Sequence, residues 1–331
     1  MVSIQLNFNY INHIMNSGLR TISVCLGLII CILSGSPWQL AAQQTGVLFQ
    51  TGFEASEGYS PISNLNGVNG WASTSNGGSG IPDDSFFPNE GQQAFIGFAP
   101  FDDISEENFS LFLWNPVNFT PSGPEDSLVE FKVMFQIFDS STGSRDDFRW
   151  SFFNRENKRL FTIDFDNSSL RINYLLGSSS DFILTRTPFV NDRPYQLRVV
   201  LNFQTNKWSA FLDDQLILEE LPLVEDGIEA SLSDVSIIWS VKDVSAPGDN
   251  FMVFDNYQIS VLSTKPTVEM FKDPDGTVVL RASSSISSTW QLQYSDNLTS
   301  WETLFDANLG PNPSEWEIDL SREAGFWRFV P

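Results

Sequence analysis

Two short stretches decide the fold class: FRWSF at residues 148–152 and FTIDF at residues 161–165. In each stretch, large apolar side chains occupy every second position and polar side chains lie between them. This alternation is typical of a strand with one face in a core and the other toward solvent or a ligand. It recurs at 197–202 and 236–241, whereas the spacing of three and four residues typical of helices is almost absent. The sequence therefore predicts an all-β protein with antiparallel sheets.

Turn-forming residues separate the expected strands. Asp-Asn-Ser at 166–168, Gln-Thr-Asn at 204–206 and Asp-Asp at 213–214 each favour a tight connection between neighbouring strands. A meander through residues 128–220 follows from these turns. Residues 57–91 are rich in Gly, Asn, Ser and Pro instead, which predicts long loops, and long loops in a compact domain are often functional.

The N-terminal region has the pattern of a secretory signal peptide. Arg20 supplies the positive charge, an apolar run covers 22–33, and small residues end at Ala42. The run is shorter than the roughly 20 apolar residues that a membrane-spanning helix needs. We expect residues 1–42 to be removed, with Met15 as an alternative start. The mature chain is then secreted or held at the cell surface, without a membrane span.

Processing at this point would remove every cysteine and the single histidine. Cys25 and Cys31 lie inside the apolar run, and His13 precedes it. A mature chain without them excludes a cysteine nucleophile, a histidine-containing triad, a Cys/His zinc site and any disulfide.

The charge balance is strongly acidic. The chain has 18 Lys and Arg against 41 Asp and Glu, a formal net charge of −23. Such a field repels phosphate backbones, so nucleic acid is not an expected partner. Divalent cations are natural ligands for an acidic surface, although solubility alone accounts for the composition equally well.

We expect two domains after the signal peptide. The larger one covers 43–262 and ends with a strand at 251–262. The smaller one covers 263–331 and contains six short apolar stretches separated by turn residues, including Asp-Pro-Asp-Gly at 273–276. About 65 residues in six short strands make a small β-sandwich or barrel.

The larger domain resembles a known group of folds. It opens with TGFE at 51–54 and GVNGW at 67–71, and it closes with FDNYQI at 254–259. These motifs resemble the concanavalin A-like jelly rolls, especially the laminin-G-like and MAM-like branch, over residues 46–262. The cysteines of MAM domains are missing, which argues against true membership of that branch.

This resemblance implies a structural calcium ion. In such jelly rolls the first and last strands are neighbours, which would bring Glu54 close to Asp255, with Asn256 as a further oxygen ligand. Oxygen-only ligands suit Ca²⁺. The alternative is that Glu54 is an exposed residue at the end of a strand and that Asp255 belongs to a turn or a strand edge.

The smaller domain resembles a C-terminal module of secreted bacterial proteins. It contains Leu292, Tyr294, Ser295, Leu298 and Trp301 in the order L-x-Y-S-x-x-L-x-x-W, and it ends with FWRFV at 326–330. The resemblance implies a surface or secreted protein, but it assigns no activity to the module.

Glycan binding is the expected function, because exported jelly rolls often bind sugars through aromatic and polar side chains. Trp71 lies in the loop region, where its ring could be exposed or could plug the end of a sandwich. The polar positions of the strands form a second candidate surface, which could also be plain solvated sheet. Its candidate residues are Arg149, Asp164, Arg171, Asn173 and Arg198.

Catalysis is not the first expectation. Two carboxylates suffice for a glycosidase, but the Glu-x-Asp-x-x-Glu strand motif of one hydrolase family of this fold is absent. We therefore expect a non-catalytic binding or surface protein whose partner is a polysaccharide or a cell-surface glycan. The alternatives are a polysaccharide-degrading enzyme with an unrecognised carboxylate pair and a purely structural or adhesive surface protein.

Overall fold

The computed structural model describes most of the chain. The described residues are 2–6, 46–62, 64–83, 85–102, 104–107, 109–263, 266–272, 277–284, 288–295, 299–310, 313–318 and 325–330. The chain divides into two compact units, Gly46–Leu262 and a second one formed by Met1–Thr45 with Ser263–Pro331. Within the expected signal peptide, only 2–6 belong to the described residues.

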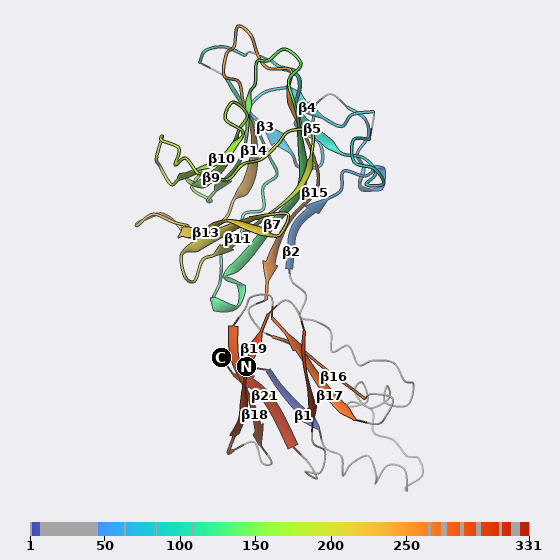
Figure 1. The fold of residues 1–331 in the computed structure, drawn as a ribbon, viewed down its shortest axis with the longest axis vertical. Helices are drawn as coiled ribbons and strands as arrows, with labels where there is room; N and C mark the ends of the chain where they lie inside the picture. Colours follow the sequence, from blue (N-terminus) through green and yellow to red (C-terminus); the bar gives the residue numbers. More distant parts are fainter. Residues whose placement is uncertain are drawn as a thin grey trace. The chain divides into compact units, whose positions relative to one another are not determined.

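The larger unit consists of two antiparallel sheets (Figure 1). The six-stranded sheet has the order β10-β9-β8-β14-β6-β3. Its strands are β3 (Ala72–Ser73), β6 (Ser110–Trp114), β8 (Asp147–Phe153), β9 (Arg159–Asp166), β10 (Arg171–Leu176) and β14 (Asp234–Ser240). The eight-stranded sheet has the order β13-β12-β11-β7-β15-β5-β4, and β2 pairs with β15. Its strands are β2 (Gly46–Thr51), β4 (Gly77–Gly80), β5 (Ala94–Phe101), β7 (Leu128–Phe138), β11 (Pro194–Asn202), β12 (Lys207–Leu212), β13 (Gln215–Pro222) and β15 (Phe251–Leu262).

The core between the two sheets is rich in aromatic side chains. Phe148, Trp150 and Phe152, the apolar positions of the first deciding stretch, are fully buried. Phe161 of β9 stacks on Trp208 of β12, with ring centroids 3.8 Å apart, and so joins one sheet to the other. Burying each such side chain contributes about 2–3 kcal/mol to folding. The predicted all-β sandwich is confirmed, and the described residues contain no α-helix.

The turns at 166–168, 204–206 and 213–214 are where the sequence predicted them, and the turn predicted at 273–276 lies outside the described residues. The single meander is wrong. Strand β7 belongs to the eight-stranded sheet, β8 to β10 form a meander in the six-stranded sheet, and β11 to β13 form another in the eight-stranded sheet. Alternation specifies which face of a strand is buried. It does not specify which of two sheets the strand joins.

The second unit also consists of strands. One sheet has the order β1-β21-β18-β19 and the other has the order β16-β17-β20. Their bounds are Val2–Leu6 (β1), Thr267–Lys272 (β16), Val278–Ser283 (β17), Ser288–Ser295 (β18), Glu302–Leu309 (β19), Ser314–Ile318 (β20) and Gly325–Val330 (β21). Leu280, Leu292, Trp327 and Phe329 are buried in its core. Among the described residues six strands follow residue 266, which is the number that the sequence predicted, and the pairing of β1 with β21 was not predicted. The described part of the chain has no helix that could cross a membrane.

Candidate functional site

Strand β15 carries a bulge that defines the first candidate site. The register between β15 and β7 shifts between Asp255 and Gln258. Asn256 is the extra residue, and it has a left-handed φ of 51°. A bulge of this kind re-aims the neighbouring side chains. Phe254 and Tyr257 both stay in the core, while Asp255 lies between them on the opposite face of the strand.

The carboxylate of Asp255 is buried without full compensation. The residue is 0% exposed. Its Oδ1 accepts a hydrogen bond from the backbone N–H of Asn256 at 2.6 Å, and its Oδ2 has no partner among the described atoms. Burial raises the pKa of Asp255 to about 7, and the negative charges of Glu54, Glu90 and Glu57 add to the rise. An uncompensated buried carboxylate is costly, so the site favours a positive charge.

The three residues predicted to hold calcium come together around Gly52. A Cβ atom on Gly52 would lie 3.7 Å from Cγ of Glu54, 3.8 Å from Oδ1 of Asp255 and 4.0 Å from Oδ1 of Asn256. Glu54 also lies under Gly91, where a Cβ atom would come within 1.9 Å of its Oε1. Gly91 has a φ of +74°, so both its conformation and the lack of space require glycine here.

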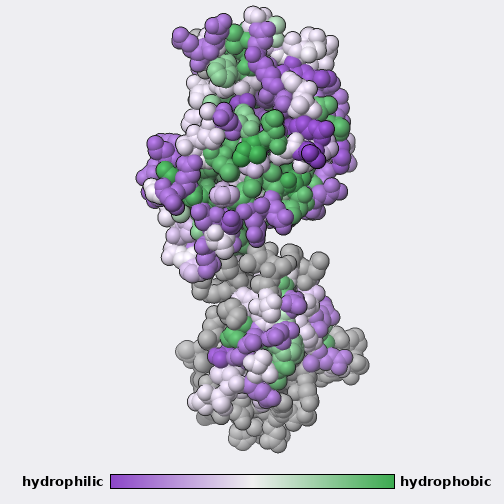
Figure 2. All heavy atoms as spheres, turned by 60° about the vertical axis from the view of Figure 1, so that its left-hand side comes forward, coloured by the Kyte–Doolittle hydropathy of each residue, from purple (hydrophilic) through white to green (hydrophobic). Residues whose placement is uncertain are grey.

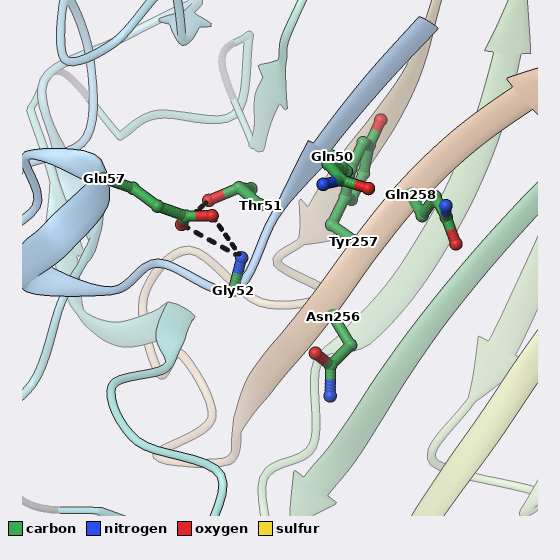
Figure 3. Close-up of a pocket in the computed structure, with 7 residues that line it drawn as sticks. All are labelled: Gln50, Thr51, Gly52, Glu57, Asn256, Tyr257 and Gln258. Atoms are coloured by element: carbon green, nitrogen blue, oxygen red, sulfur yellow. Dashed lines mark hydrogen bonds between the residues drawn. The ribbon is translucent and has the colours of Figure 1, made fainter. Parts of the chain in front are cut away.

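Two further glutamates adjoin this site, and sequence reasoning missed both. Oε2 of Glu57 accepts hydrogen bonds from Oγ1 of Thr51 at 2.8 Å and from the backbone N–H of Gly52 at 3.1 Å (Figure 3). Oε2 of Glu90 accepts one from Nδ2 of Asn256 at 3.2 Å. No short motif marks either glutamate, because the fold brings them to the last strand from distant positions.

The donor set at Asp255 consists of oxygen atoms. Among the described residues, no group of three or more acidic, histidine or cysteine side chains is arranged to hold a metal ion. A cation here would therefore use few carboxylates, together with the amide oxygen of Asn256, backbone carbonyls and water. A pocket of about 220 Å³ opens beside the site (Figure 3). It is lined by Gln50, Thr51, Gly52, Glu57, Asn256, Tyr257 and Gln258.

The second candidate site is the outer face of the six-stranded sheet. Arg149 of β8 pairs in register with Asp164 of β9, and Asp164 pairs with Asn173 of β10. Arg171 of β10 pairs with Asp166 in the next outward-facing row. The predicted residues Arg149, Asp164 and Arg171 therefore share one face of three adjacent strands.

Ion pairs fix the charged side chains of this face. Nε of Arg149 donates to Oδ1 of Asp164 at 2.7 Å, and Nζ of Lys242 lies 2.9 Å from Oδ1 of both Asp147 and Asp166. Burial raises the pKa of Asp164, partly offset by Arg149. Burial and then the charge of Asp164 raise the pKa of Asp147 to about 6, against the opposing effect of Lys242. The carboxylates of Asp147 and Asp164 are themselves buried, so they fix the positions of Lys242 and Arg149.

A hydrophobic surface adjoins the same edge of the larger unit. Ile183 and Leu184, which follow β10, and Leu216 of β13 are exposed. Strands β10 and β13 are the edge strands of their sheets and lie on the left in Figure 1. Figure 2 turns this side forward and shows hydrophobic residues gathered among hydrophilic ones. Such a mixture suits ligands with both hydroxyl groups and C–H faces.

Two expected ligand-binding residues lie elsewhere. Trp71 is 1% exposed, and its Nε1 donates to the hydroxyl of Tyr59 at 3.0 Å. Its ring packs among core aromatics, so of the two alternatives the buried plug is confirmed, and Trp71 is not an exposed ligand-binding ring. Arg198 belongs to β11 of the other sheet, where it lies over the ring of Phe211 and 3.6 Å from Glu130. The polar strand positions therefore form two surfaces, one on each sheet.

Comparison with known proteins gives no family. No protein-family model matches the sequence. No curated protein matches it at a significant level.

Several solved structures match part of this chain. A sialidase has 8% identity and a TM-score of 0.44, and the match covers 65% of this chain and 19% of that one. A carbohydrate-binding module, CBM66 from Bacillus subtilis, has 15% identity and a TM-score of 0.35 over 58% of this chain and 95% of that one. A Bacillus subtilis protein of unknown function with a galectin-like fold has 10% identity and a TM-score of 0.42 over 66% and 98%. At such values the similarity does not indicate what this chain binds.

Proposed function

We propose that this is an exported, non-catalytic protein that binds a polysaccharide or cell-surface glycan on the outer face of its six-stranded sheet. The observation that carries the proposal is that exposed Arg171 and partly exposed Arg149 lie in adjacent rows of that face, above the buried Asp164 and Asn173. Guanidinium groups donate hydrogen bonds to sugar hydroxyl oxygens, and the ion pair with Asp164 holds Arg149 in position.

We also propose that a calcium ion at Asp255 stabilises the sandwich. The support is its buried Oδ2 without a hydrogen-bond partner, the amide oxygen of Asn256 nearby and the adjacent glutamates. None of the described ion pairs involves Glu54, Glu57, Glu90 or Asp255. The resemblance to laminin-G-like or MAM-like domains, from which this calcium site was predicted, stays a prediction from the sequence.

Affinity electrophoresis of the purified protein through gels containing single polysaccharides tests the glycan proposal. At least one neutral or acidic polymer should retard the protein in a saturable way. Arg171→Gln should weaken that retardation because Arg171 is exposed on the proposed face. Lys207→Gln, an equal charge change on the exposed side of β12, is the matched control and should not. If no polymer retards the protein in a saturable way, the proposal is contradicted and a structural or adhesive role is favoured.

A second function has one observation in its favour. Asp147 has a pKa raised to about 6 and lies near Asp164, and a protonated carboxyl beside a carboxylate can act in glycoside hydrolysis. The ion pairs of both groups support a positioning role instead. Assays for reducing ends released from the retarding polymers separate the two functions. If reducing ends are released and Asp147→Asn abolishes that release, the protein is a glycoside hydrolase.

A further inference from the structure

Positive charge is concentrated in one part of this acidic chain. Residues 147–186 contain six basic and five acidic residues, a formal net charge of +1, whereas the whole chain carries −23. These residues include β8, β9 and β10, three neighbours in the six-stranded sheet. At physiological salt, charges more than about 8 Å away are largely screened, so a ligand on these strands responds to the local charge.

Most of this positive charge has no acidic partner. Within the larger unit, the described ion pairs leave five basic residues without one. These are Lys158, Arg159, Arg171, Arg186 and Lys207. The first four lie on or beside β9 and β10, and only Lys207 lies in the other sheet. In a chain with an excess of acids, unpaired cations gathered at one place favour an anionic ligand.

Two guanidinium groups converge on the segment 177–182. Cζ of Arg149 lies 4.9 Å from the centroid of the Phe182 ring. Arg159 donates from Nε to the carbonyl of Gly177 at 2.9 Å and from Nη2 to the carbonyl of Ser179. Burial and then the positive charge of Arg149 lower the pKa of Arg159, and the charge of Glu225 opposes them. Their Nη1 atoms make no hydrogen bond with described atoms, while Nε of Arg149 stays paired with Asp164.

A pocket of about 240 Å³ lies next to Arg159. It is lined by Phe153, Asn157, Lys158, Arg159, Leu160, Gly177, Ser178, Glu225 and Ile228. Apolar side chains supply part of the wall. Lys158 and Arg159 bring two positive charges to it and Glu225 one negative charge, so the lining stays net positive. Sites for drug-sized ligands measure about 300–1,000 Å³, so this pocket suits a single sugar ring.

We infer that the glycan is acidic: a carboxylate or sulfate group binds at Arg149 and Arg159, and a neighbouring sugar ring enters the pocket beside Lys158. Guanidinium groups bind planar or tetrahedral oxyanions through paired hydrogen bonds, which are stronger than hydrogen bonds between neutral groups. The inference rests on the proposed glycan function and adds the charge of the ligand and the place where that charge is recognised.

Matched polymers test the charge of the ligand. Polygalacturonate is compared with its methyl ester, and dextran sulfate with dextran, in affinity electrophoresis of the full chain. Retardation by polygalacturonate and not by its ester indicates carboxylate recognition; retardation by dextran sulfate alone indicates sulfate. Equal or stronger retardation by the neutral member of each pair would overturn the inference and leave the proposed function standing. No retardation by any polymer, in this set or the wider panel, would overturn both.

Variants test the place. The double variant Lys158→Gln/Arg159→Gln should weaken binding of the acidic polymer at least about tenfold, because charge-assisted hydrogen bonds are lost. Lys207→Gln is the control for loss of a cation on the other sheet. The affinity for any neutral polymer that binds the wild type should change little. Thermal melting identifies a variant that fails to fold. If the double variant does not fold, the single variant Lys158→Gln, which changes an exposed residue, is used to test the place of binding. An unchanged affinity for the acidic polymer in a folded variant refutes the assignment of the binding place to Lys158 and Arg159.

Discussion

Replacing Asp255 with Asn should stabilise the metal-free protein. The pKa of Asp255 is raised from 3.8 to about 7 in the folded state. As the pH rises from about 4 to about 7, the unfolded chain loses this proton and the folded chain keeps it, so stability falls over that window. Above about pH 7 the full penalty applies. Three pKa units at 1.36 kcal/mol each give about 4 kcal/mol.

The Asn side chain has the same shape and can still accept the hydrogen bond from the N–H of Asn256 without carrying charge. In chelator at about pH 8, Asp255→Asn should therefore melt about 10 °C above the wild type, at roughly 2–4 °C per kcal/mol for a unit of this size. With excess Ca²⁺ the order should reverse, because the cation stabilises only the wild type in proportion to its occupancy.

Differential scanning calorimetry at about pH 5 and pH 8, with Ca²⁺ and with chelator, measures this crossover. Asp249→Asn is a matched control. Hydrogen bonds from Ser140 and Ser141 lower the pKa of Asp249, so its charge favours folding and its removal should not stabilise the protein. If the melting temperature of the wild type at about pH 8 is the same in Ca²⁺ and in chelator, the proposed calcium site is wrong.

Three other outcomes follow from the geometry. Gly91→Ala should abolish the Ca²⁺-dependent shift in melting temperature, because the new methyl group collides with the carboxylate of Glu54. Trp71→Ala should cost about 3–5 kcal/mol in urea unfolding, as for other buried aromatic side chains, and the folded fraction should bind glycan normally. Glycan affinity should change with pH near 6, where Asp147 titrates, and Asp147→Asn should flatten that dependence in binding assays from about pH 5 to pH 7.

Local patterns predicted the strands well. The alternation in 148–152 and 161–165 correctly assigned Phe148, Trp150 and Phe152 to the core, and the predicted last strand, Phe251–Leu262, has the bounds of β15. Strand alternation is a property of consecutive residues, so the sequence contains it directly. The sheet that each strand joins depends on contacts between distant residues, which is why the single meander was wrong.

The residues of the candidate sites were also predictable where local patterns place them and unpredictable where distant contacts do. Arg149, Asp164 and Arg171 could be placed on one face because they occupy the polar positions of neighbouring strands. Glu90 could not be predicted, since its partner Asn256 is 166 residues away in the chain. Trp71 was ambiguous beside Gly70 because the aromatic rings that bury it come from separate strands.

The bulge at Asn256 also separates the proposed cation site from the regular strand that carries it. Phe254 and Tyr257 are three positions apart, yet both face the core. Without Asn256 they would be two positions apart, which is the ordinary spacing of a strand. A chain lacking this one residue therefore keeps every later side chain of β15 on its present face. The proposed cation site therefore depends on a one-residue insertion into a regular strand, and a single deletion could remove that insertion while the sheet is kept.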